Sequence, residues 1–201
     1  MMKQILAAAC AMAMMLTGAA MAETDVRVTA LKGPTAMGMA ALMNEAESGA
    51  VNGNDYAFTI ASAVDEVSPK LVKGETDIAA VPANLAAVLY GKTGGAVEVL
   101  AVNTLGVLYI VENGETVQSM ADLKGQTIVA AGKGSTPEYA LRYLLTENGI
   151  DPDKDVTIDW KSEHSECVAA LASGQAAIAL LPQPFVTVAQ TKIEGLRMAL
   201  D

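Results

Sequence analysis

Short apolar segments alternate with longer amphipathic segments along most of this chain. The short apolar runs predict buried strands, and segments of about ten residues with apolar positions at helical spacing predict helices. Because strands that alternate with helices form parallel sheets covered on both faces, the pattern predicts an α/β fold. The predicted strands cover residues 26–31, 56–61, 77–81, 97–102, 107–112, 127–131, 156–160 and 176–181, with a further strand at 195–201. The predicted helices cover residues 36–47, 64–73, 83–90, 137–148, 163–172 and 184–192.

The chain contains an internal repeat at an offset of about 100 residues. Leu71–Pro82 (LVKGETDIAAVP) aligns with Leu171–Pro182 (LASGQAAIALLP). Upstream of these segments, the matching positions are Ser62 with Ser162, Glu66 with Glu166, and Lys32–Thr35 (KGPT) with Lys133–Thr136 (KGST). Several matches in the same order predict two similar units. We therefore expect two lobes, at residues 23–113 and 114–201, each with a mainly parallel sheet flanked by helices.

The first 22 residues have the pattern of a secretory signal peptide. Lys3 precedes an apolar run from Ile5 to Leu16, and the segment ends in the small residues Ala20 and Ala22. An apolar run of this length is too short to span a bilayer, which needs about 20 residues. Since Leu16-Thr17-Gly18 is followed by alanine instead of cysteine, a lipid anchor is less favoured. We expect a secreted or periplasmic protein.

Composition excludes several classes of function. The chain has 201 residues with 13 basic and 23 acidic side chains, a net charge of −10, which disfavours nucleic acid and anionic membrane surfaces as partners. Neither a phosphate-binding G-x-x-x-x-G-K-[ST] loop nor a dinucleotide G-x-G-x-x-G motif is present. No nucleophile elbow or carboxylate pair indicates catalysis, so we expect no enzyme, no catalytic residue, no metal and no cofactor.

Two loops of the repeat are candidate binding positions. Each K-G-x-T segment follows a predicted strand and precedes a predicted helix, where ligands of parallel sheets are bound. Gly33 and Gly134 allow the backbone to approach a ligand closely, and Thr35 and Thr136 are predicted helix N-caps. The N–H groups and the helix dipole favour an anion or a polar oxygen there. Capped helices without a ligand remain the alternative.

Three other side chains have two interpretations each. His164 and Cys167 are one helical turn apart and could share a metal with Glu163, but a third well-spaced ligand is missing, and Cys167 in the core is favoured. Trp160 is expected in the core in preference to a stacking role in the cleft. Met37 could line the cleft; it is otherwise expected in the core, as are Met39, Leu42 and Met43.

Five segments resemble solute-binding proteins of bacterial ABC importers. They are Leu31–Met39 (LKGPTAMGM), Asp77–Asn84 (DIAAVPAN), Ala121–Ile128 (ADLKGQTI), Gly132–Leu141 (GKGSTPEYAL) and Ile178–Val186 (IALLPQPFV). The resemblance is strongest to the branch that includes nitrate, sulfonate, taurine and thiamine-precursor binders. It implies a type II periplasmic-binding fold with two lobes that close on a solute, and a permease as membrane partner of a monomeric binding protein.

Binding loops of the family follow the first three strands of each lobe. Carried over onto this chain, they give the candidates Gly33, Pro34, Thr35, Ser62, Pro82, Ala83, Asn84, Gly134, Ser135, Thr136, Ser162, His164, Gln183 and Pro184, with Asn103 and Met37 as further candidates. Family members are longer, so the resemblance also implies that the return strands of the first lobe and the C-terminal part of the second are missing. A hinge is expected at residues 112–115.

The predicted function is capture of a small polar or anionic organic solute for delivery to a permease. Two alternatives stay open. One is a sensory ligand-binding module, and the other is an enzyme of the thiamine-pyrimidine type on the same scaffold.

Overall fold

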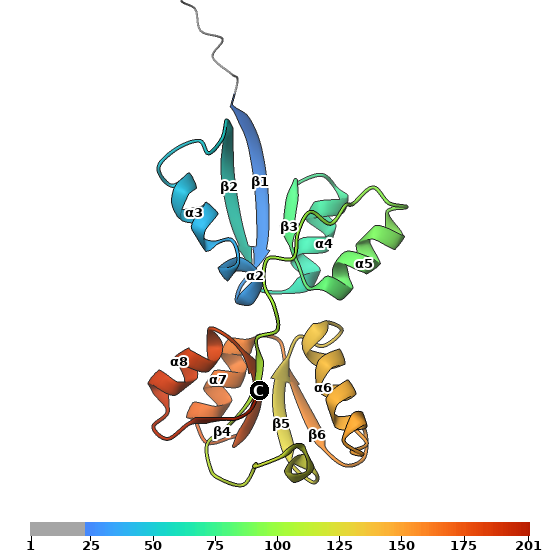
Figure 1. Cartoon of the computed structure of the whole chain (residues 1–201), viewed down its shortest axis with the longest axis vertical. Helices are drawn as coiled ribbons and strands as arrows, with labels where there is room; N and C mark the ends of the chain where they lie inside the picture. Colours follow the sequence, from blue (N-terminus) through green and yellow to red (C-terminus); the bar gives the residue numbers. More distant parts are fainter. Residues whose placement is uncertain (1–22) are drawn as a thin grey trace, which may run out of the picture.

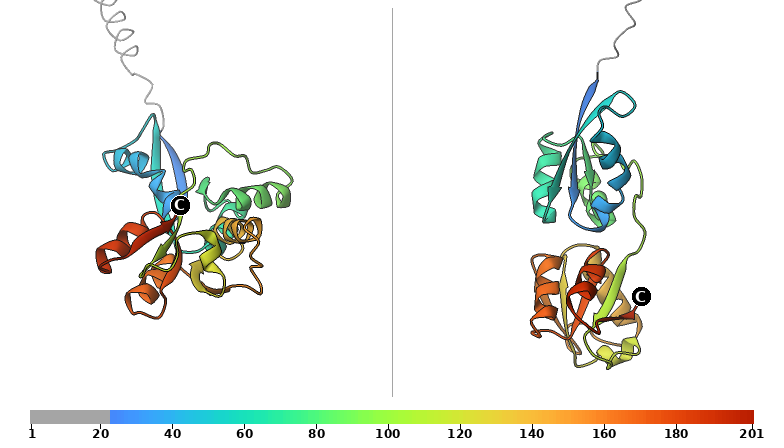
Figure 2. Two further views of the ribbon diagram at one scale, coloured as in Figure 1. Left: turned by 60° about the horizontal axis from the view of Figure 1, so that its bottom comes forward. Right: turned by 90° about the vertical axis from the view of Figure 1, so that its left-hand side faces the viewer.

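The computed structural model describes residues 23–201, and the predicted signal peptide at residues 1–22 lies outside the described part of the chain. Two separate sheets form two lobes stacked end to end (Figure 1). The chain passes between the lobes along one side of the molecule (Figure 2). Among the described residues, no helix combines the length and the apolar character needed to cross a membrane.

The first lobe contains a three-stranded parallel sheet in the order β2-β1-β3. β1 and β2 pair over their whole length, from Thr24 opposite Asn54 to Leu31 opposite Ala61. The elements are β1 (Thr24–Leu31), α2 (Pro34–Met37), α3 (Ala40–Ala46), β2 (Asn54–Ala61), α4 (Val64–Val72), β3 (Ile78–Ala80) and α5 (Ala83–Lys92).

The second lobe contains a five-stranded mixed sheet in the order β6-β5-β7-β4-β8. β5 runs parallel to β6 and β7, whereas β4 is antiparallel to both β7 and β8. Helices α7 and α8 lie on one side of this sheet and α6 on the other (Figure 1). The elements are β4 (Leu108–Glu112), a 3₁₀ helix η1 (Met120–Leu123), β5 (Thr127–Ala131), α6 (Thr136–Glu147), β6 (Thr157–Lys161), α7 (His164–Ala172), β7 (Ile178–Pro182), α8 (Phe185–Lys192) and β8 (Arg197–Leu200).

The sequence repeat corresponds to a repeated structural unit. In both lobes the three parallel strands lie in the order second, first, third along the chain. Helices α4 and α7 also end alike, because Gly74 and Gly174 follow them with φ of 70° and 72°. Their N–H groups donate to Leu71 and Leu171 at 3.1 Å in each copy. A left-handed residue after a helix favours glycine, which explains why K-G and S-G stand at this position of the repeat.

The second lobe has a core on each face of its sheet. Val129 and Ala131 belong to the buried cluster under α7 and α8, whereas Ile128 and Ala130 belong to the cluster under α6. This alternation follows from the two-residue period of a strand. Cys167, on the buried face of α7, is fully buried as predicted, and burial raises the pKa of its thiol to about 12. The predicted core position of Trp160 is likewise confirmed, since it packs against the cluster under α6.

The first lobe is much less buried. Its buried cluster consists of Leu31, Ala61 and Val67 with a few partly buried neighbours. The prediction that the methionines near residue 40 form core was wrong: Met37 is 50% exposed. The other three predicted members, Met39, Leu42 and Met43, are only partly buried and lie outside the buried clusters of the described residues.

The predicted helix at residues 36–47 is divided into α2 and α3 at Gly38 and Met39. Glycine is a poor helix former, so Gly38 weakens the helix at this point. A segment 65 residues further along the chain packs closely against Gly38, and this packing is described with the site below.

The predicted strand at residues 97–102 is absent. Residues 96–107, which we call the strap, contain no strand and connect the two lobes. Their apolar side chains are exposed, with 76% for Leu100 and 84% for Leu105. A β-rich sequence forms a strand only beside a hydrogen-bonding neighbour, and β3, at three residues, pairs with β1 alone among the described strands.

The predicted lobe boundary at residues 113 and 114 was wrong by one strand. β4 pairs with β7 from Leu108 opposite Pro182 to Glu112 opposite Ile178, so it belongs to the second lobe. The predicted hinge at residues 112–115 therefore lies inside this lobe, at the far end of β4. The chain crosses between the lobes in the strap.

Candidate functional site

All six parallel strands end at one cavity between the lobes. The cavity has a volume of about 950 Å³. The residues that end or directly follow these strands line it, namely Leu31, Lys32, Ser62, Val81, Pro82, Ala131, Gly132, Lys161, Ser162 and Pro182. This position, outside the carboxyl ends of parallel strands, is where α/β sheets bind ligands.

Five helices of eight or more residues begin at the same cavity, besides the short α2, whose first residue Pro34 also lines it. The first residue of each lines the wall: Val64 of α4, Ala83 of α5, Thr136 of α6, His164 of α7 and Phe185 of α8. The first N–H groups of a helix have no acceptor within the helix, and its N-terminus carries a partial positive charge. The cavity is therefore surrounded by positive helix ends from both lobes.

Lysines outnumber acids in the wall. Lys32, Lys133 and Lys161 line the cavity together with Asp65 and Glu163. Lys161 is paired with Asp159 at 2.9 Å, and Lys32 approaches Glu163 at 3.9 Å across the two lobes. Lys133 forms no ion pair within residues 23–201, so its charge is free to attract an anion.

His164 contributes an uncharged imidazole ring to the wall. Its ring lies 5.2 Å from the ring of Phe185, tilted by 40°, and burial lowers the pKa of His164 to about 4. Its Nδ1 atom is buried without a hydrogen-bond partner among the described residues. The alternative of a shared metal is not supported, because no three His, Cys, Asp or Glu side chains of residues 23–201 gather as metal ligands.

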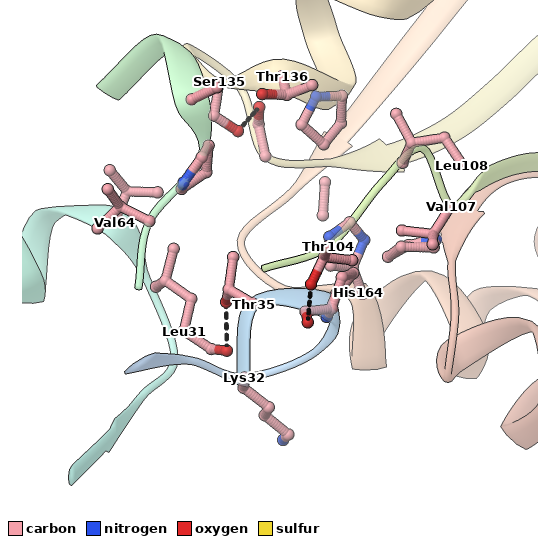
Figure 3. Close-up of a pocket in the computed structure, with 18 of the residues that line it drawn as sticks. Leu31, Lys32, Thr35, Val64, Thr104, Val107, Leu108, Ser135, Thr136 and His164 are labelled. Atoms are coloured by element: carbon pink, nitrogen blue, oxygen red, sulfur yellow. Dashed lines mark hydrogen bonds between the residues drawn. The ribbon is translucent and has the colours of Figure 1, made fainter. Parts of the chain in front are cut away.

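The strap forms one wall of the cavity and is held by the first two residues of α2. The Asn103 side chain donates to the Thr35 carbonyl at 3.0 Å, and the Thr104 hydroxyl donates to the Pro34 carbonyl at 3.0 Å. Figure 3 shows Thr104 bonded in this way next to Thr35 and His164. Gly38 permits the contact, because a Cβ atom there would lie 2.6 Å from the Asn103 carbonyl oxygen and 2.7 Å from the Thr104 hydroxyl.

Replacing Gly38 with alanine is expected to destabilise the protein by about 1–3 kcal/mol, since the strap must move away from α2. Gly91 in α5 is the matched control, because a Cβ atom there meets nothing within 4 Å. Alanine at position 91 is expected to stabilise the helix by about 0.5–1 kcal/mol. Thermal unfolding followed by circular dichroism should shift the two variants in opposite directions. Equal shifts would show that the strap does not pack against Gly38.

Ten of the sixteen residues predicted to bind the ligand line the cavity, and six do not. The ten are Pro34, Thr35, Ser62, Pro82, Ala83, Asn103, Ser135, Thr136, Ser162 and His164. The six outside the lining are Gly33, Met37, Asn84, Gly134, Gln183 and Pro184. Gly33 lies against the Phe185 ring, Met37 is half exposed, and the Gln183 side chain accepts a hydrogen bond from Thr187. Contact with a ligand remains a prediction for all ten.

The two K-G-x-T loops are not equivalent as helix starts. The N-caps of α2 and α6 are Gly33 and Ser135, so the prediction that Thr35 and Thr136 are caps was wrong. The Thr35 hydroxyl donates to the Leu31 carbonyl, and the Thr136 hydroxyl to the side chain of Asn84. α2 has only four residues, whereas α6 has twelve. Only the second loop begins a helix with a sizeable dipole.

Sequence reasoning missed several residues of the wall. The lysines of the two K-G-x-T segments were visible in the repeat and line the cavity beside the predicted residues. Apart from Asn103, the strap gave no such signal, and neither did Phe185, because the position of an irregular segment depends on contacts far along the chain.

A family model described as ABC transporter, phosphonate, periplasmic substrate-binding protein matches residues 38–198, which is most of the chain. The chain belongs to this family. The sequence resemblance favoured the nitrate, sulfonate, taurine and thiamine-precursor branch, whereas the family match is with the phosphonate-binding proteins. The broader prediction, a periplasmic solute-binding protein of ABC importers, agrees with the match. A search of curated proteins gave no significant match.

Solved structures of the same architecture support the predicted fold. An ABC transporter structure from Parabacteroides distasonis has a TM-score of 0.71 and 25% identity, over 89% of this chain and 59% of that one. The periplasmic aliphatic sulphonate binding protein SsuA from Escherichia coli has a TM-score of 0.63 and 20% identity, over 89% and 60%. A binding protein component of an ABC phosphonate transporter from Pseudomonas aeruginosa has a TM-score of 0.60 and 15% identity, over 88% and 64%. The two-lobe α/β fold of periplasmic binding proteins is thereby confirmed, and the chain spans about three fifths of the length of these structures.

Proposed function

We propose that this chain is the solute-binding component of an ABC importer and holds a small organic anion with a phosphonate or sulfonate head group between its lobes. The single observation that carries the proposal is the convergence of five helix N-termini and three lysines on one cavity. In a chain with 23 acidic side chains and only 13 basic ones, this gathering of positive groups favours an anion at this position.

The rest of the wall favours an organic solute over an inorganic ion. Apolar side chains from both lobes and the strap surround the positive groups, among them Leu31, Val81, Val102, Leu105 and Phe185. Ligand sites with predominantly apolar walls and a few placed polar groups bury the body of the ligand and orient its head. The cavity of about 950 Å³ also exceeds what nitrate or sulfate would fill.

Isothermal titration calorimetry with methylphosphonate, phenylphosphonate and the corresponding sulfonates tests the proposal. Dimethyl methylphosphonate serves as the neutral control, because it keeps the shape of the head group without its charge. We expect binding of the anions that weakens as salt is added, and none of the neutral ester. Failure of every anion to bind would contradict the proposal.

Replacing Lys133 with glutamine is expected to raise the Kd of the anions by about 5- to 30-fold, because a charge-assisted contact contributes about 1–2 kcal/mol. Lys192 at the end of α8 is the matched control, since it is exposed and outside the cavity wall. Its glutamine variant should bind like the wild type. Equal affinities of the two variants would remove Lys133 from the site.

A further inference from the structure

Asn84 connects the two lobes without lining the cavity. It is the second residue of α5 in the first lobe. Its side-chain amide donates to the Gly134 carbonyl of the second lobe at 3.2 Å, and its amide oxygen accepts from the Thr136 hydroxyl at 3.2 Å. Both halves of the amide are therefore engaged by one loop of the other lobe.

The loop that receives Asn84 is held rigidly by its own bonds. The Gly134 N–H donates to the Glu138 carboxylate at 2.7 Å, and the buried Ser135 hydroxyl donates to the Gly132 carbonyl at 2.8 Å. The Gly134 carbonyl and the Thr136 hydroxyl are thus presented in fixed positions. The Gly134 carbonyl and the Thr136 hydroxyl are spaced to match the N–H and the oxygen of one side-chain amide, which favours a specific contact with Asn84 over a chance surface contact.

The contact of Asn84 with Gly134 and Thr136 lies on one side of the cavity. Figure 3 draws Ser135 and Thr136 on one side of the cavity and Lys32 on the other. Lys32 and Gly33 approach Glu163 and Phe185 of the second lobe there, without a short hydrogen bond between them. The repeat places Pro184 at the position that corresponds to Asn84, and proline has no side-chain amide.

We propose that Asn84 is a closure latch that stabilises the arrangement in which the lobes meet, and that it does not contact the solute. The proposal rests on the proposed function in one respect, namely that the lobes close on a ligand. Solute binds the closed form. A change that makes the closed form less stable therefore raises the Kd of every solute by the same factor. Asn84 acts through Gly134 and Thr136 and is a positioning residue.

The expected effect of Asn84→Ala follows from two lost hydrogen bonds. Because each exposed neutral bond replaces bonds to water, it contributes only about two- to fivefold, and the loss of both should raise Kd by about 5- to 30-fold. The factor should be the same for phosphonates and sulfonates of different size, and it should appear in the dissociation rate. A residue that touches the solute would instead give a factor that depends on the head group.

The experiment measures Kd for methylphosphonate, phenylphosphonate and ethanesulfonate in the wild type, Asn84→Ala and the control Asn44→Ala. Asn44 is exposed on α3 of the same lobe. In parallel, spin labels at Glu47→Cys and Glu147→Cys, one exposed position in each lobe, report the distance between the lobes by pulsed electron resonance. We expect Asn84→Ala to raise all three Kd values by one factor and to reduce the closed population, and Asn44→Ala to do neither.

Two outcomes would overturn the latch. One is an unchanged closed population and unchanged Kd in Asn84→Ala. The other is an unchanged closed population with Kd factors that differ between the three anions, which would assign Asn84 to the ligand. If no anion binds to the wild type, the proposed function fails, and the label distances of wild type and Asn84→Ala alone decide whether the latch exists.

Discussion

Replacing Glu112 with alanine is expected to lower the free energy of unfolding of the second lobe by about 3–5 kcal/mol, the usual loss when one partner of a buried ion pair is removed. Glu112 is only 1% exposed and ends β4. Its carboxylate accepts from the Thr116 N–H at 2.8 Å, the Val117 N–H at 3.1 Å, the Thr116 hydroxyl and the Arg197 guanidinium. Burial alone would raise the pKa of Glu112, but these bonds together lower it, so the group is charged in the folded protein.

The loss has two parts that separate variants can distinguish. Alanine leaves two backbone N–H groups without an acceptor and removes the carboxylate from the Arg197 guanidinium, which keeps only the Gly114 and Val117 carbonyls, whereas Glu112→Gln keeps an oxygen for Thr116. The double variant Glu112→Ala, Arg197→Met removes both charges and should recover part of the loss. Since β8 pairs with β4 next to this bond, the double variant also tests how firmly the last strand is held.

Urea unfolding followed by tryptophan fluorescence measures these variants. The chain has one tryptophan, Trp160, and it lies in β6, so its signal reports the second lobe. A loss below 1 kcal/mol in Glu112→Ala would mean that the Glu112 network is solvated or not formed.

The repeated unit could be predicted from the sequence because its signals are local. Strand and helix limits in both copies follow from apolar runs, from glycines such as Gly74 and Gly174 after the helices, and from the order of segments. The carboxyl ends of the parallel strands meet at one edge of each sheet, and the family resemblance placed binding loops there, of which Ser62, Pro82 and Ser162 line the cavity.

The remaining features depend on contacts between distant segments. The close packing of the strap against Gly38 involves Asn103 and Thr104, and residues 36–47 carry no signal of these distant partners. The membership of β4 in the second lobe follows from its pairing with β7, which an apolar run cannot specify. Asn84 was predicted beside the ligand because it follows a strand, but its partners belong to the other lobe.

Acidification from pH 6.5 to pH 4 is expected to destabilise the second lobe through His164, by up to about 3 kcal/mol if the full pKa difference is expressed. His164 is partly buried beside Phe185, its Nδ1 atom is buried without a partner among residues 23–201, and burial lowers its pKa from 6.5 to about 4. Between these two values the unfolded chain binds a proton that the folded chain does not. Stability therefore rises with pH across this window and is constant, as far as His164 is concerned, above pH 6.5 and below pH 4.

Carboxylates contribute in a different part of the pH scale, which allows His164 to be isolated. Asp77, Glu112 and Asp122 have pKa values below their ordinary ones, so the stability they provide is lost as the pH falls below about 5. In urea titrations of Trp160 fluorescence at pH 5 to 7, the wild type should lose stability toward acid, and His164→Leu should not. Equal slopes in the two proteins would show that His164 is hydrated and takes up its proton in the folded state. His164 would then be a fourth positive group in the cavity wall, beside the three lysines, below pH 6.5.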